Sequence, residues 1–231
     1  MKKTISDIVE SQVKAWGKIY EDDPKDREGN RNKPLITISR EFGAGGAALA
    51  ALLAEKTGFR LWDKELLGAI ANDLGSDEKF VETLDERRQM LLEEAVAGFL
   101  TNVHTNVNYL QSLIRMVRTI EQHGNGIIVG RGANFICEKK TSFHIRVVSP
   151  LKVRVSNYAK KNKIGRYQAS GIIKKKDEER AEFIKDNFHR DVADPSNYDV
   201  VLNSNLYSLE QLADIIVNIY QMKTGKQAIK A

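Results

Sequence analysis

The stretch from residue 35 to residue 57 constrains the fold more than any other part of the chain. A short β-branched apolar run at residues 35–39 is followed by Gly43, Gly45 and Gly46, and then by an Ala/Leu-rich helical segment at residues 46–57. A strand, a glycine turn and a helix in this order direct main-chain N–H groups toward one point, where they can bind a phosphate. A tight turn with no ligand is equally compatible with this pattern.

Composition favours one α/β domain of ordinary to large size. The chain has 231 residues, 42% of them hydrophobic and 29% charged, and a mean hydropathy of −0.41. No apolar run approaches the roughly 18 residues that a membrane span needs, and no signal peptide is evident. The single cysteine, Cys137, excludes an internal disulfide framework. We therefore expect a cytoplasmic protein without a membrane partner.

The charge balance favours small phosphorylated ligands. The formal net charge is +5 and the pI is about 9.1, which suits phosphate-bearing small molecules as well as nucleic acid. The basic run at 174–176 is followed at once by the acidic run at 177–179, and no basic stripe with interleaved aromatic residues is evident. The sequence therefore predicts no nucleic-acid partner.

The pattern of elements predicts an N-terminal extension and one domain. Residues 1–33 are expected to form an amphipathic helix and a polar linker that packs on the domain or on a partner subunit. Residues 34–231 alternate strands with helices, which predicts a parallel sheet covered by helices on both faces. Segments 76–123 and 150–190 are too long for simple crossovers and are expected to be a helical insertion and a lid. The expected strands are at residues 35–39, 59–62, 127–129, 143–148 and 198–203.

The glycine loop departs from the full phosphate-loop pattern G-x-x-x-x-G-K-[ST]. When Gly45 is aligned with the second glycine, Gly46 stands at the lysine and Ala47 at the hydroxyl residue. The main-chain cradle can persist without the ammonium group and the magnesium-binding hydroxyl. The guanidinium of Arg40 could lie across the phosphates instead, and an ion pair with Glu41 or a lid carboxylate is the alternative.

Charged residues near the predicted carboxyl edge of the sheet are further candidates. Arg131 directly follows a buried strand, and burying its charge is costly unless an anion or a carboxylate meets it. On the lid, Lys176, Asp177 and Arg180 have helical spacing that places them on one side, although a solvated helix face is as common. Asp63 either orients magnesium-bound water or caps the next helix. The four histidines show no metal-ligand spacing, so no protein-held metal is expected.

The motifs, in order along the chain, resemble those of the cytidylate kinase-like family, divergent relatives of the P-loop nucleoside-monophosphate kinases. The resemblance covers about residues 35–220. The matching segments are residues 36–46 (ITISREFGAGG), 62–67 (WDKELL), 128–133 (IVGRGA), 194–199 (DPSNYD) and 202–204 (LNS).

This resemblance implies a P-loop kinase-type three-layer α/β/α fold with a helical monophosphate-binding insertion and a helical lid. It implies transfer of the ATP γ-phosphate to CMP or a similar small acceptor with Mg²⁺. Compared with true cytidylate kinases, Gly46 replaces the loop lysine, Gly132 an acceptor-binding aspartate, and Ala69 an acceptor-binding arginine. A nucleotide-binding sensor or scaffold is therefore the alternative to an enzyme, and a homodimer is left open.

By position, the resemblance assigns the roles as follows. Gly43, Gly45 and Gly46 would hold the donor phosphates, and Arg131 would contact the acceptor. Asp177 would bind the cytosine or orient the lid, and Arg180 would clamp the transferring phosphates. When the candidates found from the residues themselves are added, Arg40, Arg131 and Arg180 are the catalytic candidates. The loop positions are Gly43, Ala44, Gly45, Gly46 and Ala47, and the acceptor positions are Asp63, Arg131, Lys176 and Asp177.

Overall fold

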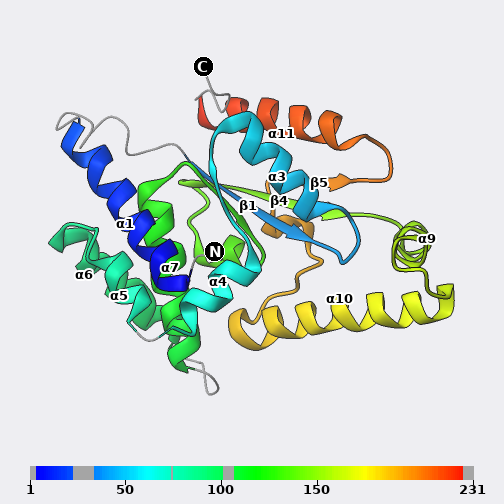
Figure 1. Cartoon of the computed structure of the whole chain (residues 1–231), viewed down its shortest axis with the longest axis horizontal. Helices are drawn as coiled ribbons and strands as arrows, with labels where there is room; N and C mark the ends of the chain where they lie inside the picture. The colour runs from blue at the N-terminus through cyan, green and yellow to red at the C-terminus, as the bar shows by residue number, and fades with distance from the viewer. Residues whose placement is uncertain (1–3, 23–33, 74, 101–106, 226–231) are drawn as a thin grey trace.

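A parallel sheet forms the centre of the structure (Figure 1), a computed structural model that describes residues 4–22, 34–73, 75–100 and 107–225. Within these residues the sheet has five strands in the order β2-β3-β1-β4-β5. The first strand along the chain is therefore central, and its neighbours come from much later in the sequence. The strands are β1 (Leu35–Arg40), β2 (Arg60–Trp62), β3 (Gly126–Val129), β4 (Ser142–Val148) and β5 (Val200–Asn203).

The register of the sheet aligns the carboxyl ends of its central strands. On one side of β1, Ile38 pairs with Val129 of β3, and on the other side Arg40 pairs with Val147 of β4. The N–H of Gly130 donates to the carbonyl of Ile38 over 3.0 Å. As a result, the loops that follow β1, β3 and β4 meet at one edge, where open α/β sheets bind their ligands.

Two helices cover one face of the sheet: α3 (Gly46–Thr57) and α11 (Leu209–Thr224). The side chain of Ser208 accepts a hydrogen bond from the N–H of Gln211 in a capping box at the start of α11. The apolar stripes of both helices pack on inward-facing strand residues such as Ile36, Ile38 and Ile145, which are fully buried. Figure 1 shows both helices on the same side of the sheet.

The other face carries the helical insertion. Its innermost helices pack on Trp62 and Ile128 of the sheet, and α1 covers the outside, where the ring of Trp16 contacts Trp62, Phe80 and His123. The N-terminal helix therefore packs on its own chain. The helices on this face are α1 (Ile5–Asp22), α4 (Lys64–Ala71), α5 (Ser76–Val81), α6 (Glu86–Leu100), α7 (Val107–His123) and α8 (Ala133–Ile136).

A pair of helices, α9 (Leu151–Asn162) and α10 (Arg166–Phe188), extends beyond the carboxyl edge of the sheet (Figure 1). They pack on each other through a small core of Val155, Ala159, Ala169 and Ile173. The 3₁₀ turn η1 (Pro195–Asn197) then leads into β5.

The observed elements match the expected fold closely. The three-layer α/β/α arrangement is confirmed, and α3 has the predicted bounds, because Gly45 and Gly58 at its two ends take the left-handed conformation. The helical region at 85–123 resolves into α6 and α7, with residues 101–106 outside the described part of the chain. Most of the predicted polar linker also lies outside the described residues. The short helix α8 was not predicted. No described helix combines the length and apolar character required to cross a membrane.

A buried histidine makes stability depend on pH. His144 on β4 is 1% exposed, and its Nδ1 lies 2.7 Å from Oγ1 of Thr37. Burial, assisted by nearby lysines and opposed by Asp199, lowers the pKa of His144 to about 4. The unfolded chain therefore binds a proton between about pH 6.5 and pH 4 that the folded chain does not bind, so acid favours unfolding in this range.

We expect His144→Gln to lose less stability than the wild type between pH 6.5 and pH 4, by on the order of 1–3 kcal/mol. Urea unfolding at several pH values measures this difference. Burial and the charge of Arg88 lower the pKa of His123 to about 3. His123 should therefore maintain part of the dependence of stability on pH in the variant. Identical slopes for wild type and variant would contradict the assignment.

Candidate functional site

The glycine loop lies at the carboxyl end of β1 and opens directly into α3. Gly43 and Gly45 have φ values of +83° and +79°, a region that other residues rarely adopt. Gly45 is the N-cap of α3 and provides no side-chain cap. The N–H groups of the first helical turn must therefore find partners outside the helix. All the loop positions predicted from the sequence, Gly43, Ala44, Gly45, Gly46 and Ala47, lie in this one turn.

The side chain of Arg40 passes between two glycines. A Cβ atom on Gly46 would lie 2.8 Å from Cβ and 3.0 Å from Cγ of Arg40, and one on Gly130 would lie 2.0 Å from its Nη1. These separations are too short for real atoms, so both positions need glycine while Arg40 keeps this conformation. The residue in place of the loop lysine is therefore small because an arginine stem occupies the space beside it. A cation is still supplied at the loop, but from β1.

Arg131 points away from the loop, toward the insertion. Its Nε donates to the carbonyl of Lys64 over 3.3 Å, and its guanidinium lies 5.7 Å from the ring centre of Tyr109. Its Nη2 is so near α4 that a Cβ on Gly68 would approach it to 2.4 Å. Burial raises the pKa of Tyr109, and the charge of Arg131 opposes this shift. Arg131 therefore adjoins the insertion, whereas Arg40 adjoins the loop.

A cavity of about 640 Å³ lies beyond Tyr109, between α4, α5 and α7. Its lining is mostly polar and includes Asn72, Asp77, Gln111 and Arg115. Tyr109 lines this cavity and also contacts Arg131, so its ring lies between the guanidinium and the cavity.

Asp63 is the N-cap of α4. Its Oδ1 accepts a hydrogen bond of 2.8 Å from the N–H of Leu66, which is the structural alternative that the sequence offered for this residue.

The lid contacts the loop through two of the three predicted lid residues. Nη1 of Arg180 donates to the carbonyl of Arg40 over 3.0 Å, and its guanidinium lies 5.3 Å from the ring centre of Phe42. Oδ1 of Asp177 accepts from the N–H of Phe42 over 2.6 Å. Lys176 is instead exposed and pairs with Glu179 over 2.6 Å. The structure therefore brings Asp177 and Arg180 to the loop but not Lys176.

A buried arginine that the sequence analysis missed joins the lid to the loop. The side chain of Arg154 on α9 is 7% exposed. It donates to the carbonyls of Ser149 and Phe42 over 2.8 and 3.0 Å, and to Oδ2 of Asp177 over 2.6 Å. Glu41, whose carboxylate also accepts from the N–H of Ser149, lies 3.4 Å from its Nε. The available signal was position alone, because Arg154 lies on the first helical turn after strand β4.

A phenylalanine closes the position where cytidylate kinases carry an acceptor-binding aspartate. A Cβ on Gly132 would lie 2.2 Å from Cε2 of Phe188 at the end of α10. Phe188 also stacks on Phe135 with ring centres 5.7 Å apart. A side chain at position 132 would therefore displace this aromatic contact.

The described residues contain no group of three or more His, Cys, Asp or Glu side chains placed to hold a metal ion. With Ala47 at the hydroxyl position, a metal at the loop would have to be held mainly by the phosphates of a bound ligand.

Comparison with known proteins identifies the family. A family model described as "Cytidylate kinase-like family" matches residues 35–206, which is most of the chain and includes the loop, Arg131, Arg154 and the lid. The chain therefore belongs to the cytidylate kinase-like family. A search of proteins with curated functions returns no match.

Solved structures resemble the chain in fold. A crystal structure of an uncharacterized protein from Eubacterium ventriosum ATCC 27560 aligns with a TM-score of 0.64 at 20% identity, covering 82% of this chain and 99% of that one. Shikimate kinase from Bacteroides thetaiotaomicron aligns at 0.44 and 14% identity, covering 82% and 97%. Dephospho-CoA kinase from Campylobacter jejuni aligns at 0.38 and 9% identity, covering 84% and 98%.

Restoring the missing lysine should fail. In Gly46→Lys the new Cβ collides with the stem of Arg40, so we expect ATP affinity to fall at least tenfold and stability to fall by about 1–3 kcal/mol. Calorimetric titration with Mg·ATP and urea unfolding measure these changes. Ala47→Lys adds the same ammonium at the exposed neighbouring position and should fold normally. Tighter ATP binding by Gly46→Lys would contradict the packing argument.

Arg154 and Asp177 should be energetically coupled. Arg154→Met leaves Asp177 and two carbonyls without their donor, so we expect a loss on the order of 2 kcal/mol in the free energy of unfolding. In a double-mutant cycle, adding Asp177→Asn to Arg154→Met should cost less than Asp177→Asn does alone. Strictly additive effects would show that the pair is not coupled.

Proposed function

We propose that this protein is an ATP-dependent phosphotransferase that acts on a nucleoside monophosphate or a related small phosphorylated acceptor. The observation that carries the proposal is the position of Arg40. It is held between Gly46 and Gly130 beside the uncapped start of α3, so a cation adjoins the N–H groups that would receive phosphate oxygens. Family membership supports kinase chemistry of this general kind.

Phosphoryl transfer requires little covalent chemistry from the protein. It depends mainly on positioning the two substrates in line and on neutralising the charge of the transferring group. In this proposal the loop amides and Arg40 bind the β- and γ-phosphates of ATP. Arg180, which already contacts the carbonyl of Arg40, approaches the transferring phosphoryl from the lid. Mg²⁺ bound to the phosphates adds further positive charge.

The acceptor would bind on the side of the insertion. Arg131 contacts Tyr109, which lines the cavity of about 640 Å³, and its guanidinium is the proposed ligand of the acceptor phosphate. Because Phe188 closes the space at Gly132, we propose an acceptor that is not recognised through a carboxylate at that position. Asp177 would act by holding the lid on the loop, since Phe42 and Arg154 occupy both of its oxygens.

The same residues are compatible with a second candidate function, that of a nucleotide-binding sensor or scaffold that does not catalyse turnover. The observation in its favour is the absence of the loop lysine at Gly46, because losing one preorganised charged contact typically reduces rates by orders of magnitude. We further propose a division into residues 1–33 as an extension and 34–231 as the kinase domain, and a cytoplasmic location.

A coupled ADP-release assay with Mg·ATP and a panel of acceptors including CMP, dCMP and UMP tests the proposal. We expect magnesium-dependent turnover with one acceptor. Arg131→Ala should raise the KM of that acceptor at least tenfold and leave the Kd of ATP within twofold, because only the acceptor loses its charged partner. Arg87→Ala, an exposed arginine on α6, is the matched control.

The outcomes separate the two candidates. ATP binding without turnover on any acceptor would favour the sensor, and an Arg131→Ala enzyme with wild-type acceptor KM would remove Arg131 from the site. Failure of the wild type to bind ATP would overturn both.

A further inference from the structure

The helices α9 and α10 carry a charge distribution unlike that of the rest of the chain. The chain contains 36 Lys and Arg against 31 Asp and Glu, yet residues 151–176 contain nine cations and no acidic residue. The remaining residues therefore have 27 cations against 31 carboxylates and are net negative. The excess positive charge of the chain is concentrated in this one helical pair.

Most of these cations form no salt bridge with another residue that the structure describes. Arg154 is buried against the loop and Lys176 pairs with Glu179. The other seven are exposed, and the salt bridges formed among the described residues include none of them. By contrast, Lys56, Arg118 and Lys223 in the body of the protein are all paired. We name the seven the hairpin cations: Lys152, Lys160, Lys161, Lys163, Arg166, Lys174 and Lys175.

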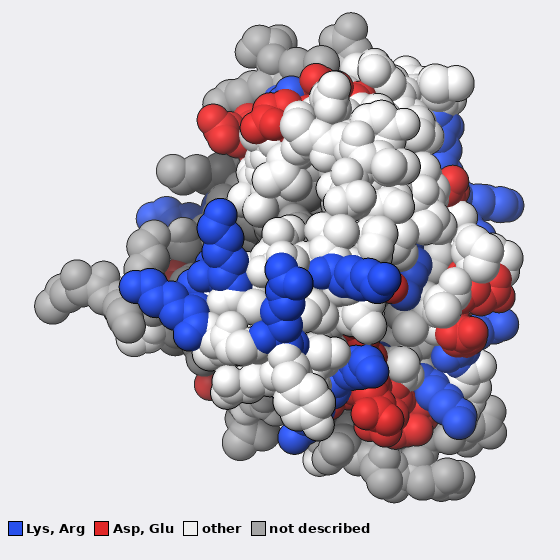
Figure 2. All heavy atoms as spheres, turned by 90° about the vertical axis from the view of Figure 1, so that its right-hand side faces the viewer, with Lys and Arg blue, Asp and Glu red and all other residues white. Residues whose placement is uncertain are grey.

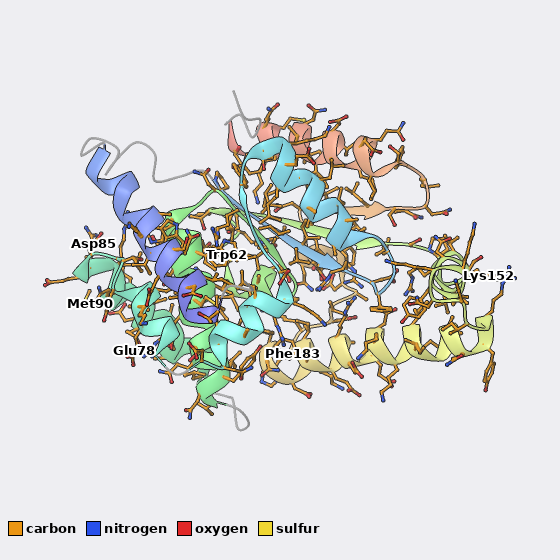
Figure 3. All side chains as sticks on the ribbon, in the orientation of Figure 1. Trp62, Glu78, Asp85, Met90, Lys152 and Phe183 are labelled. Atoms are coloured by element: carbon orange, nitrogen blue, oxygen red, sulfur yellow. The ribbon has the colours of Figure 1, made fainter. Side chains whose placement is uncertain are left out.

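The hairpin cations gather on one end of the molecule. Figure 2 views the end where α9 lies and shows Lys and Arg side chains in a band across the middle of that face, with the acidic side chains mainly at its margins. Figure 3 places Lys152 on the outward end of the molecule, far from the insertion. α9 and α10 pack on each other through their apolar sides, so their basic sides face solvent together.

The cations around the turn between the two helices are too far from the loop to serve its phosphates. Lys160 lies six residues from Arg154 along α9, or about 9 Å at 1.5 Å per residue, and Arg166 lies eleven residues from Asp177 along α10, or about 16 Å. Charges in physiological salt are screened over about 8 Å. These cations therefore form a second region of positive charge, apart from the loop.

The side chains exposed on α9 and α10 favour one class of polyanionic ligand. Tyr167, next to Arg166, is 96% exposed, and within residues 151–188 it is the large apolar side chain that faces solvent. An exposed aromatic ring among unpaired cations can stack one base while the cations neutralise neighbouring phosphates. An anionic membrane would instead require an exposed apolar helix face. Apart from Tyr167, the large apolar side chains of α9 and α10 are buried or half-buried, in the core between the two helices or against the insertion.

We infer that the outer face of α9 and α10 binds single-stranded nucleic acid, with phosphates on the hairpin cations and one base on Tyr167. This departs from the expectation drawn from the sequence, which weighed residues 174–176 against the acidic run that follows them. That expectation did not combine them with the cations of α9, which the fold brings to the same surface.

Fluorescence anisotropy of a labelled 20-nucleotide single-stranded RNA with the full chain tests the inference. The tip variant Lys160→Gln/Lys161→Gln/Lys163→Gln/Arg166→Gln should weaken binding at least tenfold. It should also reduce the slope of log K against log salt by up to about 3, since each single-strand phosphate contact contributes about 0.7. Tyr167→Ala should weaken binding at least fivefold. Mg·ATP binding should be unchanged in both variants.

A matched control removes the same charge elsewhere. Lys14→Gln/Lys79→Gln/Lys140→Gln/Lys185→Gln neutralises four exposed lysines outside the hairpin cations and should keep RNA affinity within about twofold. Equal losses in the control and the tip variant would overturn the inference in favour of a general charge effect. Tighter binding to an RNA duplex of the same sequence, or to phosphatidylserine vesicles, would overturn the assignment to a single strand.

Discussion

The position of one arginine side chain organises the candidate site. Arg40 ends the central strand, and its stem and guanidinium fill the space that side chains on Gly46 and Gly130 would otherwise take. The first residue of α3 must therefore be a glycine, and so must the first residue after β3. In the proposed site, the cation beside the loop therefore comes from the strand and not from the helix. The conformation of Arg40 therefore requires glycine at both positions, and the two glycines leave the space that Arg40 fills.

Around this arginine, the lid is attached to the loop by charged hydrogen bonds and by the packing of Phe42 against Tyr158 and the small core of α9 and α10. Asp177 accepts hydrogen bonds from a main-chain N–H of the loop and from the guanidinium of Arg154. Arg180 donates a hydrogen bond to the carbonyl of Arg40. Such bonds are individually strong when partly buried, and they are costly to leave half made. The lid is therefore held in a definite place by a small number of directional contacts.

The sequence predicted the fold well because the signals were local. Strand runs, left-handed glycines at the ends of α3 and the capping residue Ser208 each depend on a few neighbouring residues. The site was harder to predict, because its contacts join residues far apart in the chain. Arg154 lies 112 positions from the carbonyl it binds, and nothing near it in sequence marks it as buried. For the same reason, the sequence shows at Gly46 only the loss of the loop lysine, and it does not show that the Arg40 side chain lies beside this glycine.

The aromatic contacts at the end of α10 have a mechanical consequence. Phe188 touches Phe99 of α6 and Phe135, with ring centres 6.5 and 5.7 Å apart, and it rests on Gly132, the residue after Arg131. One ring thus connects the lid, the insertion and the strand loop between them. A movement of α10 away from the sheet must either break these ring contacts or move α6 with it. In the proposed reaction with two ligands, this ring would therefore couple movement of the lid to movement of the insertion, so that binding of one ligand would change the affinity for the other.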